Sequence, residues 1–446
     1  MPDLPFLPQE VIRKKRDREP LAEADIRRFV QGTVTGAVSE CQIGAFTMAV
    51  YLNGMSREER IAYALAMRDS GQVIDWSEIG LSGPTLIDKH SSGGVGDEKV
   101  SLIVAPLAAA CGIHMPMISM RGLGHTGGET DLLAAIPGYD FTPPRRRFME
   151  VVRDIGCAII GPTAELAPSD RPIFFVRDVS GTVESIPLIT GSIMSKKLAA
   201  GVNGLVMTVP FGTGAFMHTE AEARALAESM IEVASGVGVP MVALISDLTE
   251  VLGDSVGNAP QLREIVRFLT GAYRETRLLE TVLALAVEIL RMGGLAGSDA
   301  EARQRAMQRL EDGEAARRFA RMVAAFGGPA DFLDRPDAYL PTAPVVAPVF
   351  PDRAGFVAGM DCLRIGLAMV ALGAGRTRPD DSIDDAVGLA GMARVGTAVG
   401  PQRPLAVLHA RDQSGWDHAA AALRGAVRIA DAAPPDRPVI VGRLSG

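Results

Sequence analysis

Two short apolar segments in the first third of the chain each lead into a polar loop rich in glycine. Residues 85–88 precede the loop 89–97, and residues 115–120 precede the loop 121–128. An apolar stretch of helical length, 100–111, follows the first loop. The order strand, glycine loop, helix directs backbone N–H groups and a helix dipole at one place, which favours an anion. The alternative is that both loops are only tight turns.

Strands and helices continue to alternate along the chain, which is typical of α/β architecture. If the two strands before the glycine loops are neighbours in one sheet, their loops face a common pocket at its carboxyl edge. The first eighty residues are predicted to be helical. The later elements that we predict are helix 221–235, strand 240–245, helix 261–269, the helical stretch 277–326, strands 405–409 and 439–441, and helix 417–432.

Size and composition narrow the function. A chain of 446 residues exceeds what one core usually serves, so we expect more than one lobe. A net charge of −8 argues against a general nucleic-acid binder. The four cysteines are far apart in the sequence and form no CxxC pair, which argues against a zinc, redox or disulfide site. Neither a signal peptide nor a membrane-spanning run is apparent, so we expect a cytoplasmic protein without a membrane partner.

A third group of candidate residues comprises Arg177, Ser192 and Lys196. Ser192 and Lys196 are four residues apart, so both can lie on one side of a helix. Their donors and positive charges suit a uracil-like ring, which presents two carbonyls and leaves with developing negative charge. Surface salt bridges are the alternative interpretation of this group.

Taken together, these segments resemble the thymidine phosphorylase and pyrimidine nucleoside phosphorylase family. The resemblance runs nearly end to end, through residues 88–97, 116–119, 121–128, 134–139, 166–168, 177–178, 185–190, 196–197, 214–217, 339–343 and 402–407. It implies an α/β fold of the nucleoside phosphorylase II type, with a small all-helical lobe, a large mixed α/β lobe and a C-terminal α+β piece. The implied boundaries are 1–80 with a returning segment 163–193, then 81–162 with 194–340, and finally 341–446.

The resemblance also implies a reaction and a set of site residues. Family members are homodimers that use phosphate to displace the base of a pyrimidine nucleoside, which gives a sugar 1-phosphate. Base-binding roles fall on Arg177, Ser192 and Lys196, and His90 matches a histidine near base and sugar that is a candidate acid. The alternative for His90 is a hydrogen bond that stabilises its loop. The residues that match phosphate ligands are Lys89, Ser91, Ser101 and Ser119.

The sequence departs from the family most clearly at the phosphate site. Glu129 stands where the family has a phosphate-binding threonine. At about 4 Å and an effective dielectric near 20, a carboxylate repels each unit charge of phosphate by roughly 4 kcal/mol. That repulsion outweighs one good hydrogen bond to a charged group, which contributes about 1.5 to 3 kcal/mol.

Four further departures surround the same site. Residues 98–100 contain one residue more than the family has before the serine, which adds the carboxylate of Glu98 and disturbs a monovalent-cation site that some members build there. Met120 replaces a glycine, and Pro210 replaces a lysine for a reason that the sequence does not explain. Phe174 replaces a tyrosine, so that one hydroxyl near the base is lost and unusual bases become conceivable.

Several functions therefore remain open at this point. In a phosphorylase, Glu129 would turn away or pair with Lys99 or Arg121. In a hydrolase, Glu129 would replace phosphate and accept a proton from water. A nucleoside-binding protein without catalysis and a phosphoribosyl pyrophosphate-dependent transferase are the weaker alternatives. No organic cofactor or resident metal is expected, phosphate is the co-substrate of a phosphorylase, and a monovalent cation is the remaining cofactor to consider.

Overall fold

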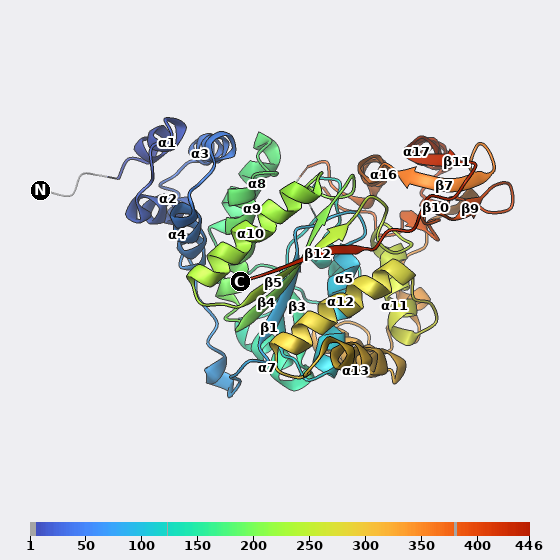
Figure 1. The fold of residues 1–446 in the computed structure, drawn as a ribbon, viewed down its shortest axis with the longest axis horizontal. Coiled ribbons are helices and arrows are strands. Elements are labelled where there is room, and N and C mark those ends of the chain that lie inside the picture. The colour runs from blue at the N-terminus through green and yellow to red at the C-terminus, as the bar shows by residue number, and fades with distance from the viewer. Residues whose placement is uncertain (1–5, 123, 379–380) are drawn as a thin grey trace, which may run out of the picture.

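The structure is a computed structural model that describes residues 6–122, 124–378 and 381–446. Residue 123, within the second glycine loop, lies outside these ranges. Figure 1 shows a helical lobe at the N-terminal end, a central part in which helices cover a sheet, and a separate strand-rich part formed by residues 345–430, after which the C-terminal strand returns to the central sheet.

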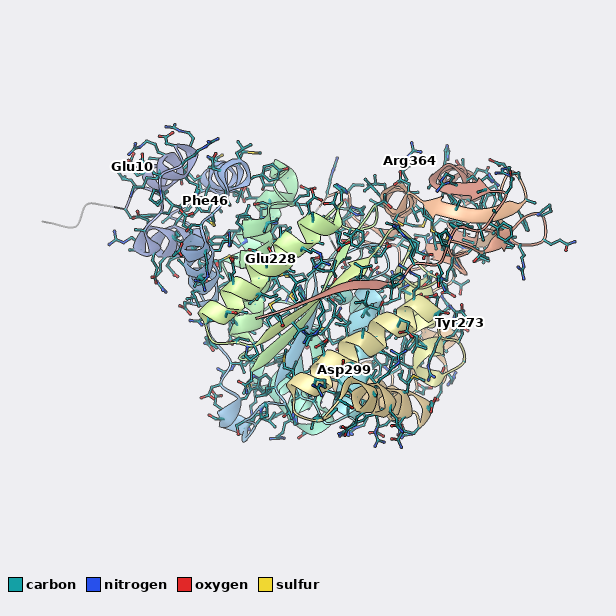
Figure 2. All side chains as sticks on the ribbon, viewed as in Figure 1. Glu10, Phe46, Glu228, Tyr273, Asp299 and Arg364 are labelled. Atoms are coloured by element: carbon teal, nitrogen blue, oxygen red, sulfur yellow. The ribbon has the colours of Figure 1, made fainter. Side chains whose placement is uncertain are left out.

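The helical lobe combines the N-terminal helices with a segment that returns from the middle of the chain. Its helices are α1 (Pro8–Arg16), α2 (Glu23–Thr35), α3 (Glu40–Asn53), α4 (Arg57–Arg68), α8 (Asp170–Ser180) and α9 (Ile186–Ala199). Capping boxes at Ser39 and Ser56 start α3 and α4. Phe46 lies buried inside the lobe, whereas Glu10 lies exposed on α1 (Figure 2). The lobe therefore has a core of its own.

A four-stranded sheet forms the centre of the molecule. Its strands are β1 (Ile87–Ser91), β4 (Gly204–Phe211), β5 (Met241–Asp247) and β12 (Ile440–Ser445), in that order. The first three are parallel, and β12 pairs antiparallel with the edge of β5. Two more parallel strands, β2 (Met115–Ile118) and β3 (Cys157–Ile160), adjoin β1 through a bridge between Leu86 and His114. The strands before the two glycine loops, β1 and β2, are thus neighbours as predicted, but only the single bridge between Leu86 and His114 joins them.

Helices cover both faces of the sheet, and the side chains of the strands alternate between them. Leu205 and Met207 pack toward α9 and α10 (Glu220–Gly236), whereas Val206 packs into the cluster around α5 (Glu98–Ala110) and α12 (Thr276–Met292). Exposed charges such as Glu228 on α10 and Asp299 on α13 (Asp299–Glu311) lie on the outer surface (Figure 2). The helices of this part are η1 (Trp76–Ile79), α5 (Glu98–Ala110), α6 (Glu129–Ala134), α7 (Arg145–Ile155), α10 (Glu220–Gly236), α11 (Asn258–Thr270), α12 (Thr276–Met292), α13 (Asp299–Glu311), α14 (Glu314–Ala325) and α15 (Pro336–Tyr339).

The C-terminal part contains two small sheets around their own hydrophobic cluster. One sheet has the order β6 (Val345–Val349), β10 (Ala406–Ala410), β8 (Gly388–Ala390), and the other has the order β11 (Val427–Ala430), β7 (Gly355–Met360), β9 (Ala398–Val399). Helices α16 (Cys362–Met369), η2 (Val370–Ala374) and α17 (Gln413–Ala426) pack with them. The expected fold class, a helical lobe with a large α/β lobe and a C-terminal α+β piece, is confirmed.

Several predicted elements differ in extent from the observed ones, and in two of them strand pairing explains the difference. β1 continues to Ser91, so Lys89 and His90 lie on a strand rather than in a loop, because parallel pairing with β4 extends that far. The helix predicted over 417–432 ends at Ala426, because the following residues pair with β7 as β11. None of the helices in the described ranges combines the length and the hydropathy that a transmembrane span requires.

Candidate active site

A cavity of about 120 Å³ lies where β1 ends, between the two glycine loops and the segment α8–α9. It brings together predicted residues from four separate stretches of sequence. Those that line it are His90, Ser91, Glu129, Phe174, Arg177, Ser192 and Lys196. The other predicted residues, Lys89, Ser101 and Ser119, are not exposed to solvent at all.

The alternation of β1 sorts its polar residues between the two sides of this site. Asp88 faces α9, where its carboxylate accepts a hydrogen bond from Lys197 at 2.7 Å. The neighbouring Lys89 faces α5, where its Nζ donates to the hydroxyl of Ser101 at 3.1 Å. His90 therefore shares the side of α9, and Ser91 shares the side of α5. One strand thus supplies polar groups to both halves of the cavity.

His90 is held in its neutral form. Burial lowers its pKa well below the ordinary value, and the nearby ammonium groups of Lys197, Lys196 and Lys89 lower it further. Its Nδ1 atom is buried and has no hydrogen-bond partner among the described residues. A neutral imidazole carries one N–H and one acceptor nitrogen. Neutral His90 can therefore donate a hydrogen bond to a ligand, but it does not begin the reaction as a protonated imidazolium acid.

Glu129 occupies the centre of the expected phosphate site. The hydroxyl of Ser101 donates to its Oε1 at 2.7 Å, and the hydroxyl of Ser119 donates to its Oε2. Because Lys89 in turn donates to Ser101, three of the four residues that match phosphate ligands are engaged with this carboxylate or with each other. Glu129 is only 8% exposed. A side-chain anion thus lies where the resemblance places a free anion.

The inserted carboxylate lies beside the same cavity. Oε1 of Glu98 accepts a hydrogen bond from Nε2 of Gln261 at 2.5 Å, whereas its Oε2 is buried and unpartnered within the described ranges. Burial raises the pKa of Glu98 to about 7 and also raises the pKa of the adjacent Asp97. Lys99, the next residue, turns away from the cavity and pairs with Glu264 at 2.6 Å. The suggested pairing of Glu129 with Lys99 is therefore wrong.

The expected base-binding group forms a buried cluster on α8 and α9. Lys196 donates to Asp170 at 2.5 Å and to the hydroxyl of Ser192 at 3.0 Å. Burial lowers the pKa of Lys196. Arg177, Ser192 and Lys196 are each no more than 6% exposed. The interpretation of this group as surface salt bridges is therefore wrong.

Arg177 is fixed by its own backbone surroundings. Its guanidinium donates to the carbonyl oxygens of Thr182, Val183 and Leu188 at 2.6 to 3.3 Å. A guanidinium has five N–H donors, so these three bonds leave two for a ligand. The same bonds hold the turn between α8 and α9, which places Ser192 and Lys196 at the cavity.

Sequence reasoning missed Asp170, the carboxylate that neutralises Lys196. Asp170 begins α8, two helical turns before Arg177, so the two residues share a face of that helix. The seven-residue spacing between Asp170 and Arg177 was the sequence signal that could have identified Asp170. Sequence reasoning also missed the buried pair of Lys197 and Asp88, although each residue adjoins one that had been selected.

A second and larger cavity, of about 640 Å³, adjoins the first and shares Met120, Arg121, Phe174 and Lys196 with it. The phenyl ring of Phe174 lies at this junction, where the tyrosine that the resemblance implies would add a hydroxyl. Within the described ranges, no group of three or more His, Cys, Asp or Glu side chains is placed to hold a metal ion. Because the two cavities adjoin, together they have room for a ligand larger than the small cavity alone would hold.

Comparison with protein families identifies the family to which the chain belongs. The α/β domain of a glycosyl transferase family matches residues 83–316, and the helical bundle domain of such a family matches residues 9–71. A pyrimidine nucleoside phosphorylase C-terminal domain matches residues 356–430. The chain belongs to the pyrimidine nucleoside phosphorylase family. It is therefore a glycosyltransferase-type enzyme, of the kind that transfers pentosyl groups.

A solved structure extends the likeness of the fold. Anthranilate phosphoribosyltransferase from Thermus thermophilus matches with a TM-score of 0.58 at 20% sequence identity, over 71% of this chain and 99% of that chain. At this identity the match concerns the fold alone. The fold of about seven tenths of this chain thus occurs in an enzyme with another named activity.

Proposed function

We propose that this protein hydrolyses the N-glycosidic bond of pyrimidine nucleosides. The observation that carries the proposal is the position of Glu129, whose carboxylate accepts hydrogen bonds from Ser101 and Ser119. These hydroxyls would otherwise be available to phosphate. The proposal thus takes the hydrolase alternative of the sequence in preference to phosphorolysis.

Electrostatics and access both disfavour phosphate at this place. A phosphate dianion beside Glu129 would be repelled by roughly 4 kcal/mol for each pair of unit charges at about 4 Å. Lys89, Ser101 and Ser119 are completely buried, so phosphate could reach them only if Glu129 moved out. Water is neutral and small, so neither charge repulsion nor restricted access prevents it from binding beside Glu129.

The base-side residues support a pyrimidine as the leaving group. The two N–H groups of Arg177 that have no partner among the described residues can bind a ring carbonyl. The ammonium of Lys196 already donates to Asp170 and Ser192, so it contributes positive charge that stabilises the negative charge developing on the base as it leaves. Neutral His90 adds an N–H donor toward base or sugar. Membership of the pyrimidine nucleoside phosphorylase family supports the same substrate class.

The proposed reaction is a single displacement at the anomeric carbon of the sugar. The oxygen of a water molecule bonds to that carbon while the carbon–nitrogen bond breaks, and the electron pair of that bond stays on the base. The carboxylate of Glu129 accepts the proton that the water loses. The base anion takes a proton from solvent on release, and Glu129 returns its proton to solvent. The products are a free base and a free sugar.

Phosphorolysis stays the second candidate, because the family to which the chain belongs is named for it. Product analysis with uridine and thymidine, in phosphate-free buffer and again with added phosphate, separates the two. We expect free sugar at the same rate in both buffers. Sugar 1-phosphate that forms only with phosphate would overturn the proposal in favour of a phosphorylase. No turnover in either buffer would overturn it in favour of a nucleoside-binding protein.

A further inference from the structure

The ammonium group of Lys99, next to the inserted Glu98, is buried and surrounded by oxygen atoms. Nζ of Lys99 contacts four oxygen atoms, and the side chain is completely buried. The four are the carbonyl oxygens of Leu252 at 3.0 Å and Ser255 at 2.8 Å, the hydroxyl of Ser255 at 3.4 Å and Oε2 of Glu264 at 2.6 Å. We call these four oxygen atoms the oxygen cage.

The oxygen cage offers one acceptor more than the ammonium group that fills it has donors. An ammonium group has three N–H donors, whereas the cage offers four acceptors. Glu264 is itself held in place, because its Oε1 accepts from the backbone N–H of Asp254 at 2.8 Å and its Oε2 accepts from the hydroxyl of Ser255. Converging carbonyl oxygens that replace a hydration shell are the ligands of potassium ions in proteins.

A glycine in the same turn permits the close approach of these groups. Gly253 has φ +75°. A Cβ atom at this position would lie 2.3 Å from Oε1 of Glu264 and 2.8 Å from Nζ of Lys99. Both distances are shorter than van der Waals contact, so a side chain here would force Glu264 or Lys99 to shift.

We propose that the oxygen cage is a monovalent-cation site that the chain fills with the ammonium group of Lys99. The expectation that a monovalent cation acts as a cofactor therefore disagrees with the residues present. No free ion fits between Leu252, Ser255 and Glu264 while Lys99 is there. The protein needs no potassium or sodium ion at this place, and it becomes dependent on one when the side chain is removed.

The oxygen cage connects to the candidate active site through the backbone. The N–H of Leu252 donates to the carbonyl of Val95 in the first glycine loop at 3.4 Å. Lys99 lies on α5, two residues before Ser101, which holds Glu129. Lys99 therefore acts as a positioning residue, because it locks the turn 252–255 against the helix and the loop that carry the site.

Replacing Lys99 by alanine tests this inference. In tetramethylammonium chloride, we expect Lys99→Ala to melt at a lower temperature and to lose nucleoside cleavage by up to about 100-fold, since small misplacements at an active site have effects of this size. In potassium chloride of the same ionic strength, we expect the melting temperature and the activity to recover, because an ion that binds only the folded state stabilises it. The wild-type protein should behave alike in both salts.

Two variants serve as matched controls. Lys99→Met fills the cage with an uncharged chain of similar length, and should be impaired without recovery in potassium chloride. Lys15→Ala removes another buried lysine, whose Nζ contacts Oε2 of Glu59 at 2.8 Å without surrounding carbonyl oxygens in the described part of the chain. It should lose stability equally in both salts.

Melting temperatures make the test independent of the proposed reaction, because the recovery by potassium is measured without any substrate. Crystals of Lys99→Ala soaked in rubidium chloride should show an anomalous peak between Leu252, Ser255 and Glu264. The inference is overturned if Lys99→Ala responds equally to both salts, or if it fails to fold even in potassium chloride. It is also overturned if the wild-type protein is activated by potassium but not by tetramethylammonium.

Discussion

Replacing Glu129 by threonine, the residue that the resemblance places at this position, is expected to exchange the proposed hydrolysis for phosphorolysis. The variant removes the carboxylate that accepts hydrogen bonds from Ser101 and Ser119. It thereby frees these hydroxyls, together with Lys89 behind them, for an external anion. The threonine hydroxyl adds one more donor in the same place.

The sizes of both effects follow from the contacts. Removing one unit charge at about 4 Å from bound phosphate relieves roughly 4 kcal/mol of repulsion for each unit of negative charge on the phosphate, so the relief is at least this large. At about 1.4 kcal/mol for each factor of ten, phosphate affinity should rise by at least about three orders of magnitude. Hydrolysis should fall by about 100- to 10,000-fold, which is the usual contribution of a general base.

Glu129→Gln provides a matched control of nearly the same shape. Its amide oxygen can accept a hydrogen bond from one serine, and its NH2 group can donate to the hydroxyl of the other, so the space stays filled. We expect hydrolysis to fall as in Glu129→Thr, but without any gain of phosphorolysis. The assay follows free sugar and sugar 1-phosphate separately over a series of phosphate concentrations, with melting temperatures as a check on folding.

Two results would refute this reasoning. Hydrolysis at the wild-type rate in both variants would show that the carboxylate takes no proton from water. Phosphorolysis by the wild-type protein, undiminished in Glu129→Gln, would show that the contacts with Ser101 and Ser119 leave the phosphate site open.

Three further predictions concern neighbouring residues. Glu98→Gln should remove a pH dependence of stability. Burial raises the pKa of Glu98 from 4.5 to about 7, so the wild-type native state loses stability as pH rises between these values. The free energy of unfolding of the variant should therefore be about 3 kcal/mol higher than that of the wild type at pH 8 and equal to it near pH 4, which denaturant titrations at several pH values would measure. Lys197→Met leaves Asp88 buried without its partner and should lower the free energy of unfolding by about 3 to 5 kcal/mol, partly restored by a second change, Asp88→Asn. Phe174→Tyr should lower the KM for uridine by about threefold to tenfold, the value of one added hydrogen bond; an unchanged KM would place the new hydroxyl out of reach of the base.

The sequence predicts those features of the site that depend on local spacing. Strand, glycine loop and helix follow one another at residues 85–111, and this order alone indicates the carboxyl edge where the cavity lies. The four-residue spacing of Ser192 and Lys196 likewise predicts their common side of α9. Both arguments need only the periodicity of one element.

Contacts between distant segments could not be predicted in this way. The oxygen cage around Lys99 comes from Leu252, Ser255 and Glu264, and two of its atoms are backbone carbonyls, which leave no signature in residue types. The fixation of Arg177 by three carbonyls is equally hidden. The direction in which Glu129 points depends on which donors the fold brings beside it, so the sequence alone left that question open.

The pairing of β12 with β5 has a consequence for how the molecule is made. β5 stays an open sheet edge, with unpaired backbone groups, until residues 440–445 have been synthesised and have returned past the whole C-terminal part. Open edges of this kind pair readily with other chains. A ribosome that stops before residue 440 would therefore release a chain whose central sheet is incomplete. Such a product is expected to aggregate, although all the residues of the active-site cavity are present in it.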